Sequence, residues 1–196
     1  MVDAIQFRKT GGPEVLERVS ITLPEPGLGE VCVRHSAIGL NFIDIYQRTG
    51  LYPTSLPTIL GTEAAGVIEA VGAGVSLTGG ARVACARGPL GAYASARIMP
   101  ANHCVPLPEN VSDVVAASSM LKGLTAWYLL HETFPVRSGD TILVHAAAGG
   151  VGQILCQWAK QLGVTVIGTV GSEAKAVIAK KAGCDHVIFY RTEDVA

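Results

Sequence analysis

The sequence has no excess of charge of either sign, because 15 Lys and Arg residues stand against 16 Asp and Glu residues. A balanced chain creates no overall field that would attract nucleic acid or an anionic membrane. Only 6% of the residues are aromatic, so side chains on which RNA bases could stack are scarce. We therefore expect small molecules or other subunits as partners, and not nucleic acid.

Long uninterrupted apolar runs are also missing. The N-terminus carries Asp3 where a secretory signal would carry positive charge, and no apolar segment of the signal-peptide type follows it. No later stretch reaches the length needed to span a bilayer without polar residues. These absences predict a cytoplasmic protein that does not enter the membrane.

The cysteines lack the spacing of a metal or disulfide motif. All five are scattered, and none forms a Cys-x-x-Cys pair. An odd number at such spacings favours neither a disulfide framework nor a zinc knuckle. We expect most of them to be small buried apolar side chains, such as Cys156 within a helical pattern beside Leu155 and Trp158.

The first half of the chain, to about residue 110, consists of short apolar runs broken by Gly and Pro. This pattern is typical of short strands. Residues 67–71 alternate between apolar and polar types and are followed by Gly72 and Gly74. A strand that turns sharply in a small barrel has this pattern. We predict a mostly β first half.

The second half of the chain has a different pattern of apolar residues. After Ser112, a candidate N-cap, an apolar stretch predicts one helix, or two helices interrupted at Gly123. Three near-continuous apolar runs follow at residues 141–146, 164–170 and 186–190, separated by two helical patterns. Strands that are apolar on both faces belong to a parallel sheet covered by helices, so this half is predicted to be α/β.

A small-residue turn lies between the first of these strands and the next helix. Ala147, Gly149 and Gly152 occupy the three positions of the dinucleotide-binding fingerprint, and the strand and helix around them supply its required context. Glycine allows the backbone to approach a pyrophosphate closely, and the N–H groups at the helix start face the anion. The residues expected to bind the cofactor here are Ala147, Gly149, Gly150, Val151 and Gly152.

The end of the second strand indicates which dinucleotide binds. An NAD site places a carboxylate there, but this strand runs into Gly171 and Ser172. Ser172, Lys175 and Tyr190 are instead suited to hold the 2′-phosphate of NADPH. Glu173 is at about the right distance for an NAD site, and we assign it to the first turn of the next helix, where the dipole stabilises it. NADPH is the favoured cofactor, with NADH as the alternative.

Three segments, at residues 41–53, 120–130 and 144–163, closely resemble the zeta-crystallin-like quinone oxidoreductases of the zinc-free medium-chain dehydrogenases/reductases. The resemblance implies a GroES-like β-barrel domain at 1–124 and a Rossmann domain at 125–196. It implies an NADPH-dependent quinone reductase that is a homodimer. It also places Asn41, Tyr46 and Tyr52 in the catalytic cleft and Thr125 near the cofactor.

Zinc-dependent members of the superfamily have Cys at the position of Asn41 and His at that of Thr62, and they carry a four-cysteine cluster that this sequence lacks. No metal is therefore expected. The chain ends after the third parallel strand, so we expect a truncated Rossmann domain whose first strand has an open edge. An enone or enoyl reductase and a non-catalytic nucleotide-binding fragment remain alternative functions.

Overall fold

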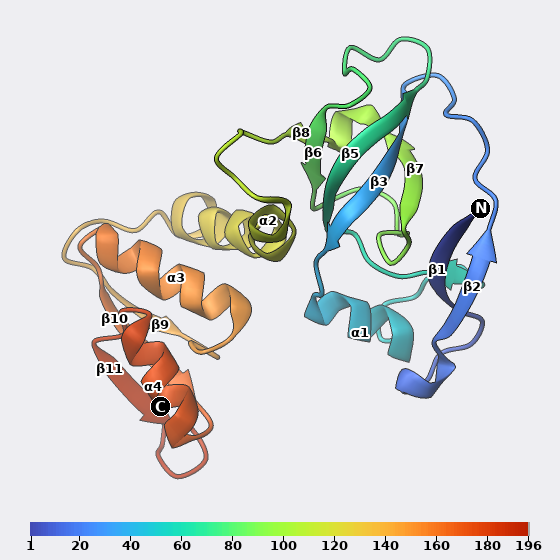
Figure 1. Ribbon diagram of the computed structural model, residues 1–196. Coiled ribbons are helices and arrows are strands. Elements are labelled where there is room, and N and C mark those ends of the chain that lie inside the picture. Colours follow the sequence, from blue (N-terminus) through green and yellow to red (C-terminus); the bar gives the residue numbers. More distant parts are fainter. Residues whose placement is uncertain (196) are drawn as a thin grey trace. The chain divides into compact units, whose positions relative to one another are not determined.

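The computed structural model describes residues 1–195, which divide into two compact units (Figure 1). The first unit covers Met1–Leu121, and the second begins at Lys122. The boundary expected from the sequence, after residue 124, falls three residues further along the same helix. No helix among residues 1–195 has both the length and the apolar character needed to cross a membrane.

The first unit is built from two antiparallel sheets. The larger has the order β7-β3-β5-β6-β8 and the smaller the order β2-β1-β4, with an isolated bridge between Ala4 and Ala94. The strands are β1 (Val2–Phe7), β2 (Glu17–Ile21), β3 (Glu30–Ile38), β4 (Thr58–Ile59), β5 (Ala64–Val71), β6 (Arg82–Cys85), β7 (Ala96–Pro100) and β8 (Val105–Pro106). The helices are α1 (Phe42–Thr49) and the short 3₁₀ turns η1 (Pro13–Val15) and η2 (Ala101–His103). The prediction of a mostly β first half is confirmed.

Strand β5 alternates as its sequence predicts. Ile68 is buried in the core of the larger sheet, whereas the neighbouring Val67 is exposed. Gly72, directly after the strand, lies so close to the backbone carbonyl of Gly27 that any side chain would collide with it. Gly74 has a φ of +76°, in the left-handed region that glycine enters without strain. The predicted sharp turn is therefore present.

One continuous helix, α2 (Asp113–Trp127), carries the chain from the first unit into the second. Gly123 does not interrupt it, because a single glycine costs a helix only about 1 kcal/mol relative to alanine. The irregularity comes later, where residues Tyr128–Thr133 form the π-helical turn η3. No residue pattern in the sequence predicts this turn.

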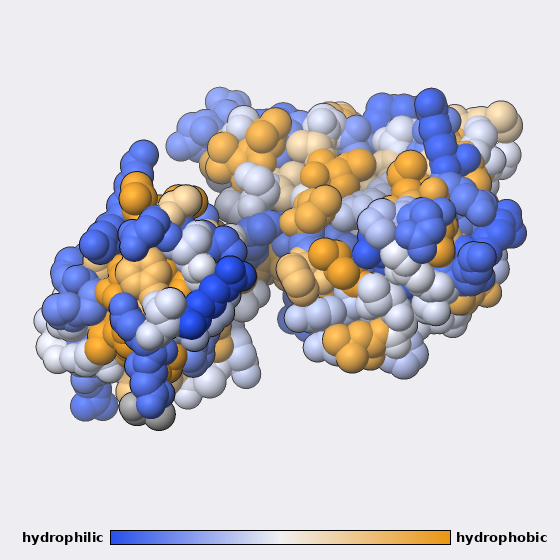
Figure 2. Space-filling model, turned by 90° about the horizontal axis from the view of Figure 1, so that it is seen from below, coloured by the Kyte–Doolittle hydropathy of each residue, from blue (hydrophilic) through white to orange (hydrophobic). Residues whose placement is uncertain are grey.

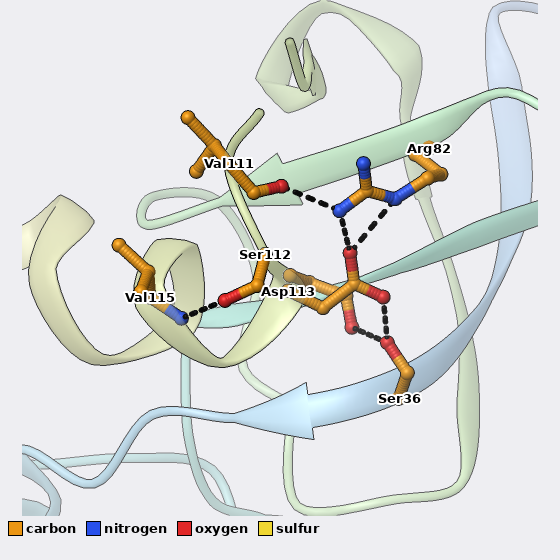
Figure 3. Close-up of polar contacts among 7 residues, drawn as sticks. Ser36, Arg82, Val111, Ser112, Asp113 and Val115 are labelled. Carbon is orange, nitrogen blue, oxygen red and sulfur yellow. Dashed lines mark hydrogen bonds and ion pairs between the residues drawn. The ribbon is translucent and has the colours of Figure 1, made fainter. Parts of the chain in front are cut away.

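The start of α2 is fixed to the sheet of the first unit (Figure 3). The predicted N-cap is present, since the Ser112 hydroxyl accepts a hydrogen bond from the backbone N–H of Val115 at 3.2 Å. Asp113 accepts hydrogen bonds from Ser36 on β3 and from Arg82 on β6. These two bonds, led by that from Ser36, lower the pKa of Asp113.

The second unit is α/β, as predicted. Its strands β9 (Thr141–Val144), β10 (Thr165–Val170) and β11 (His186–Phe189) are parallel and lie in the order β11-β10-β9. Helices α3 (Gly150–Gln161) and α4 (Glu173–Lys181) pack on β10 and on each other. Within residues 1–195, β9 pairs only with β10, so its second edge has no strand partner.

Two strands end earlier than the sequence predicts. We expected the first parallel strand to reach Ala146, but β9 ends at Val144, and Ala146 has a φ of +51°. A left-handed residue turns the chain out of the sheet, and for alanine it costs about 1–2 kcal/mol. The last strand ends at Phe189, so Tyr190 follows β11 instead of closing it.

Candidate functional site

The small-residue turn after β9 leads directly into helix α3. Gly149 is the N-cap of this helix, and its backbone N–H donates to the carbonyl of Ala146 at 2.7 Å. A Cβ on Gly152 would lie 2.8 Å from both Cα and the carbonyl oxygen of Ala147, which is fully buried. Glycine at position 152 therefore allows the helix to pack directly against the turn, as the fingerprint requires.

The first turn of α3 is suited to an anion. It contains no acidic residue, and no side chain among the described residues caps it. The backbone N–H groups of Gly150, Val151 and Gly152 are in the first turn, where N–H groups have no partner within the helix, and they lie at the positive end of the helix dipole. A Cβ on Gly150 would lie 2.9 Å from the side-chain carbons of Lys122 on α2, so this cation runs alongside the helix start. Lys122 could not be predicted as a neighbour of this turn from the sequence, because only folding brings this part of α2 beside α3.

A small cavity of about 110 Å³ adjoins the same turn. Lys175 and Tyr190 line it together with Gly149 and Gly171. The structure thus brings together three of the residues predicted to bind the cofactor. Ser172 lies beside them as the N-cap of α4, where its hydroxyl accepts a hydrogen bond from the backbone N–H of Lys175 at 3.4 Å.

Arg191 is a further cation, close to Gly171 at the wall of this cavity, and it was not among the residues predicted from the sequence. A Cβ on Gly171 would lie 2.6 Å from the Tyr190 hydroxyl and 3.4 Å from Nε of Arg191. Gly171 therefore leaves the space into which both side chains reach. The direct succession of Tyr190 and Arg191 after the last apolar run was the signal available in the sequence.

The acidic residue expected of an NAD site is not at the end of β10. That strand ends at Val170, and Glu173 is the first residue of α4, as the sequence predicted. A lysine and a phenol thus line the cavity together with glycine backbone and small apolar side chains, and an arginine lies close to Gly171 at its wall. This combination favours a phosphate over the hydroxyls of a ribose.

The second group of predicted site residues lies around helix α1 of the first unit. Asn41 is the N-cap of α1 and forms a capping box with Asp44. Its side chain is almost completely buried, and Nδ2 donates to Oε2 of Glu63 at 2.7 Å. Glu63 is fully buried, and its Oε1 accepts the backbone N–H of Leu121 at 2.7 Å. Glu63 therefore fixes the Asn41 amide and the middle of α2 at once.

Tyr46 and Tyr52 lie together, with their ring centroids 5.3 Å apart, and Tyr46 also meets Phe42 edge-on at 5.1 Å. Tyr52 is 49% exposed and Phe42 is 66% exposed, and Figure 2 shows hydrophobic side chains at the surface of both units. Such a cluster of exposed rings can take up a flat apolar molecule.

Tyr93 binds the first turn of helix α1 through Asp44. The Tyr93 hydroxyl donates to Oδ2 of Asp44 at 2.8 Å, the same oxygen that accepts the backbone N–H of Asn41. Burial, followed by this bond to Asp44, raises the pKa of Tyr93. Thr125, the remaining predicted site residue, lies on α2 in the second unit, and its place beside the cofactor stays a prediction.

The residues at the positions of a catalytic zinc do not fit that metal. Asn41 and Thr62 replace a thiolate and an imidazole, and the amide of Asn41 is engaged by Glu63. No group of three or more His, Cys, Asp or Glu side chains that could hold a metal occurs among residues 1–195. Cys85 instead contacts the buried guanidinium of Arg97 at 2.7 Å.

Comparison with known proteins agrees with both units. Residues 27–109 match the family described as alcohol dehydrogenase GroES-like domain, and residues 150–196 match the family described as zinc-binding dehydrogenase. The folds of the two units and these family matches thus define a medium-chain dehydrogenase/reductase with a GroES-like and a Rossmann-type part. The description of the second family mentions zinc, but the residues named above do not fit it.

Similar proteins narrow the class further. The chain is 53% identical over 198 residues to a quinone oxidoreductase of Pseudomonas aeruginosa and 51% identical over 197 residues to quinone oxidoreductase 1 of Escherichia coli. A 2-haloacrylate reductase of Burkholderia is 47% identical over 203 residues. All three alignments cover 100% of this chain, and they cover 61%, 60% and 61% of those proteins, respectively.

A crystal structure of the Escherichia coli quinone oxidoreductase complexed with NADPH superposes with a TM-score of 0.97 at 51% identity, over 98% of this chain and 60% of that one. The chain thus carries the alcohol dehydrogenase GroES-like and zinc-binding dehydrogenase family domains, and over its whole length it is similar to quinone oxidoreductases. It spans about three fifths of the length of the relatives it matches.

Proposed function

We propose that the protein is an NADPH-dependent reductase of quinones that works without zinc. The observation that carries this proposal is the cavity at the glycine turn. Lys175 and Tyr190 line it, Arg191 lies close to Gly171 at its wall, and the end of β10 supplies no carboxylate. A 2′-phosphate satisfies these groups, and the crystallised Escherichia coli relative carries NADPH. Each charge-assisted bond to phosphate contributes about 1.5–3 kcal/mol.

In this proposal the N–H groups at the start of α3 bind the pyrophosphate, and Lys175, Tyr190 and Arg191 bind the 2′-phosphate. NADPH supplies the reducing equivalents when bound. Tyr46, Tyr52 and Phe42 hold the flat ring of the quinone, and a tyrosine hydroxyl donates a hydrogen bond to its carbonyl oxygen. Asn41 precedes the helix that carries Tyr46, and its amide orientation is fixed by Glu63.

A metal-free mechanism suits a quinone better than an alcohol. An alcohol needs a Lewis acid that stabilises its alkoxide, whereas a quinone or an enone is already electrophilic. The second candidate function, reduction of an activated carbon–carbon double bond, is favoured by the 2-haloacrylate reductase among the relatives. A third, nucleotide binding without turnover, would leave the cavity at Lys175 occupied but the tyrosine cluster unused.

We further propose that the protein is a cytoplasmic homodimer. The balanced charge supports the location, and the homodimer is what the resemblance to the quinone oxidoreductases implies.

The test is a comparison of substrates and cofactors with the purified protein. We expect turnover of 1,4-benzoquinone with NADPH to exceed turnover with NADH and turnover of 2-chloroacrylate. Elemental analysis should find no stoichiometric zinc. Faster reduction of the haloacrylate would favour the second function, and cofactor binding without any turnover would favour the third. One zinc per chain would contradict the metal-free mechanism.

A further inference from the structure

Two thiols face each other in the core of the second unit. Cys156 lies on α3 and Cys184 lies two residues before the start of β11, and their sulfur atoms are 3.3 Å apart. Cys156 is fully buried, whereas Cys184 retains 7% of its exposure. The other cysteines have different surroundings, and Cys32 on β3 is only partly buried.

This pair lies directly behind the glycine turn. Cys156 comes one helical turn after Gly152. A Cβ on Gly168 of β10 would lie 2.6 Å from the Cys184 sulfur and 2.7 Å from Cβ of Ala147. Cys184 and the first residue of the dinucleotide fingerprint therefore pack on the same point of β10. A Cβ on Gly183 would lie 3.3 Å from the carbonyl oxygen of Cys156, so the backbone before Cys184 also approaches α3 closely.

We propose that Cys156 and Cys184 are joined into a disulfide by hydrogen peroxide, and that this bond weakens dinucleotide binding at the turn. Peroxide transfers one oxygen to the Cys184 thiol, giving a sulfenic acid and one water molecule. The Cys156 sulfur then attacks the Cys184 sulfur, and the hydroxyl leaves as a second water molecule. In total two thiols and one peroxide give one disulfide and two water molecules.

The geometry explains why this bond reaches the binding site. A disulfide has a sulfur–sulfur distance of about 2.05 Å, so the two sulfur atoms must approach by more than about 1 Å. A close-packed interior transmits such a shift to its neighbours, which here are Ala147, Gly168 and the first turns of α3. The N–H groups proposed to bind the pyrophosphate then lose their alignment.

The surroundings also keep the pair reduced under ordinary conditions. Burial raises the pKa of Cys156 to about 12 and raises that of Cys184. Both groups are therefore thiols at neutral pH, and thiols react slowly with peroxide. The slightly exposed Cys184 is the point of entry, and sustained oxidant is needed.

The first experiment identifies the bond. The folded chain is treated with hydrogen peroxide, its remaining thiols are blocked, and it is digested with trypsin without reduction. We expect a linked pair of the peptides 138–160 and 182–191, which carry Cys156 and Cys184. The Cys32→Ser variant should give the same linked pair. Full oxidation of Cys32 without the linked pair would overturn the proposal.

The second experiment measures the consequence, and it rests on the proposed cofactor site. Affinity for 2′,5′-ADP is compared before and after oxidation, and we expect a loss of tenfold or more, as for one lost charge-assisted hydrogen bond. Dithiothreitol should restore the affinity, and the Cys156→Ala/Cys184→Ala variant should be unaffected by peroxide. Equal affinities of both states, or an equal loss in the double variant, would overturn the proposal. If the reduced chain does not bind 2′,5′-ADP, the cofactor site is wrong, whereas the linked peptides still test the bond.

Discussion

The amide of Asn41 donates a hydrogen bond to Oε2 of Glu63 at 2.7 Å, and both side chains are almost completely buried. This contact lies where zinc-dependent members of the superfamily hold their metal. In this protein the carboxylate of Glu63 orients the amide of Asn41, which stands where those relatives have a metal-binding cysteine. The pair thus shows what occupies this position of the first unit, which is a buried amide bonded to a buried carboxylate.

Asn41→Asp should destabilise the protein strongly at pH 7. The change places a second carboxylate against buried Glu63, and an uncompensated buried charge costs about 3–5 kcal/mol. Chemical denaturation measures the loss. In the double variant with Glu63→Gln, the amide at position 63 donates to the carboxylate at position 41, so the hydrogen bond is restored with the two groups exchanged. The double variant should therefore recover most of the stability. A single variant within about 0.5 kcal/mol of the parent would show that the contact carries little energy.

His35 should make the protein sensitive to acid. Burial lowers its pKa from 6.5 to about 4 in the folded state, where Nδ1 contacts the carbonyl oxygen of Ala94 at 2.7 Å. Its contribution to stability is therefore complete above pH 6.5 and is lost as the pH falls toward 4. The pKa difference corresponds to about 3 kcal/mol.

The measurement for His35 is the free energy of unfolding as a function of pH. His35→Asn keeps a donor for Ala94 and removes the titration, so its stability should fall less steeply between pH 6.5 and 4 than that of the parent. His186→Asn, at an exposed histidine, is the control and should leave the slope unchanged. Identical slopes for His35→Asn and the parent would refute the assignment.

The open edge of β9 should make the 196-residue chain self-associate. A cavity of about 730 Å³ runs along this strand, and Leu143 on it is 46% exposed. Unpaired strand edges pair with a second copy unless a charge blocks them. Leu143→Lys should lower the mass measured by light scattering, while Val177→Lys on α4 should not. A monomeric parent chain would contradict this prediction.

The sequence predicted the elements that depend on local pattern. The turn at residues 147–152, the cap at Ser112 and the assignment of Glu173 to a helix follow from residue types at fixed spacings, and the structure confirms them. The left-handed Ala146 was not predicted, because an alanine carries no local signal for that conformation.

Contacts between residues far apart in the chain could also not be predicted from the sequence. Glu63 and Asn41 are 22 positions apart, and Gly171 follows β10 whereas Arg191 comes after β11, so only the folded chain brings the members of each pair together. Most of the residues predicted to bind the cofactor lie close together in the fold, because they cluster at the ends of consecutive strands.

The central claim, that the cavity at Lys175 selects NADPH through its 2′-phosphate, is tested most directly by cofactor affinity in one variant. Dissociation constants for NADPH and NADH are measured for the protein, for Lys175→Ala and for Lys180→Ala, an exposed lysine on the same helix. Lys175→Ala should weaken NADPH binding about tenfold to a hundredfold and leave NADH binding nearly unchanged, while Lys180→Ala should change neither. An equal loss for both cofactors in Lys175→Ala would contradict the account.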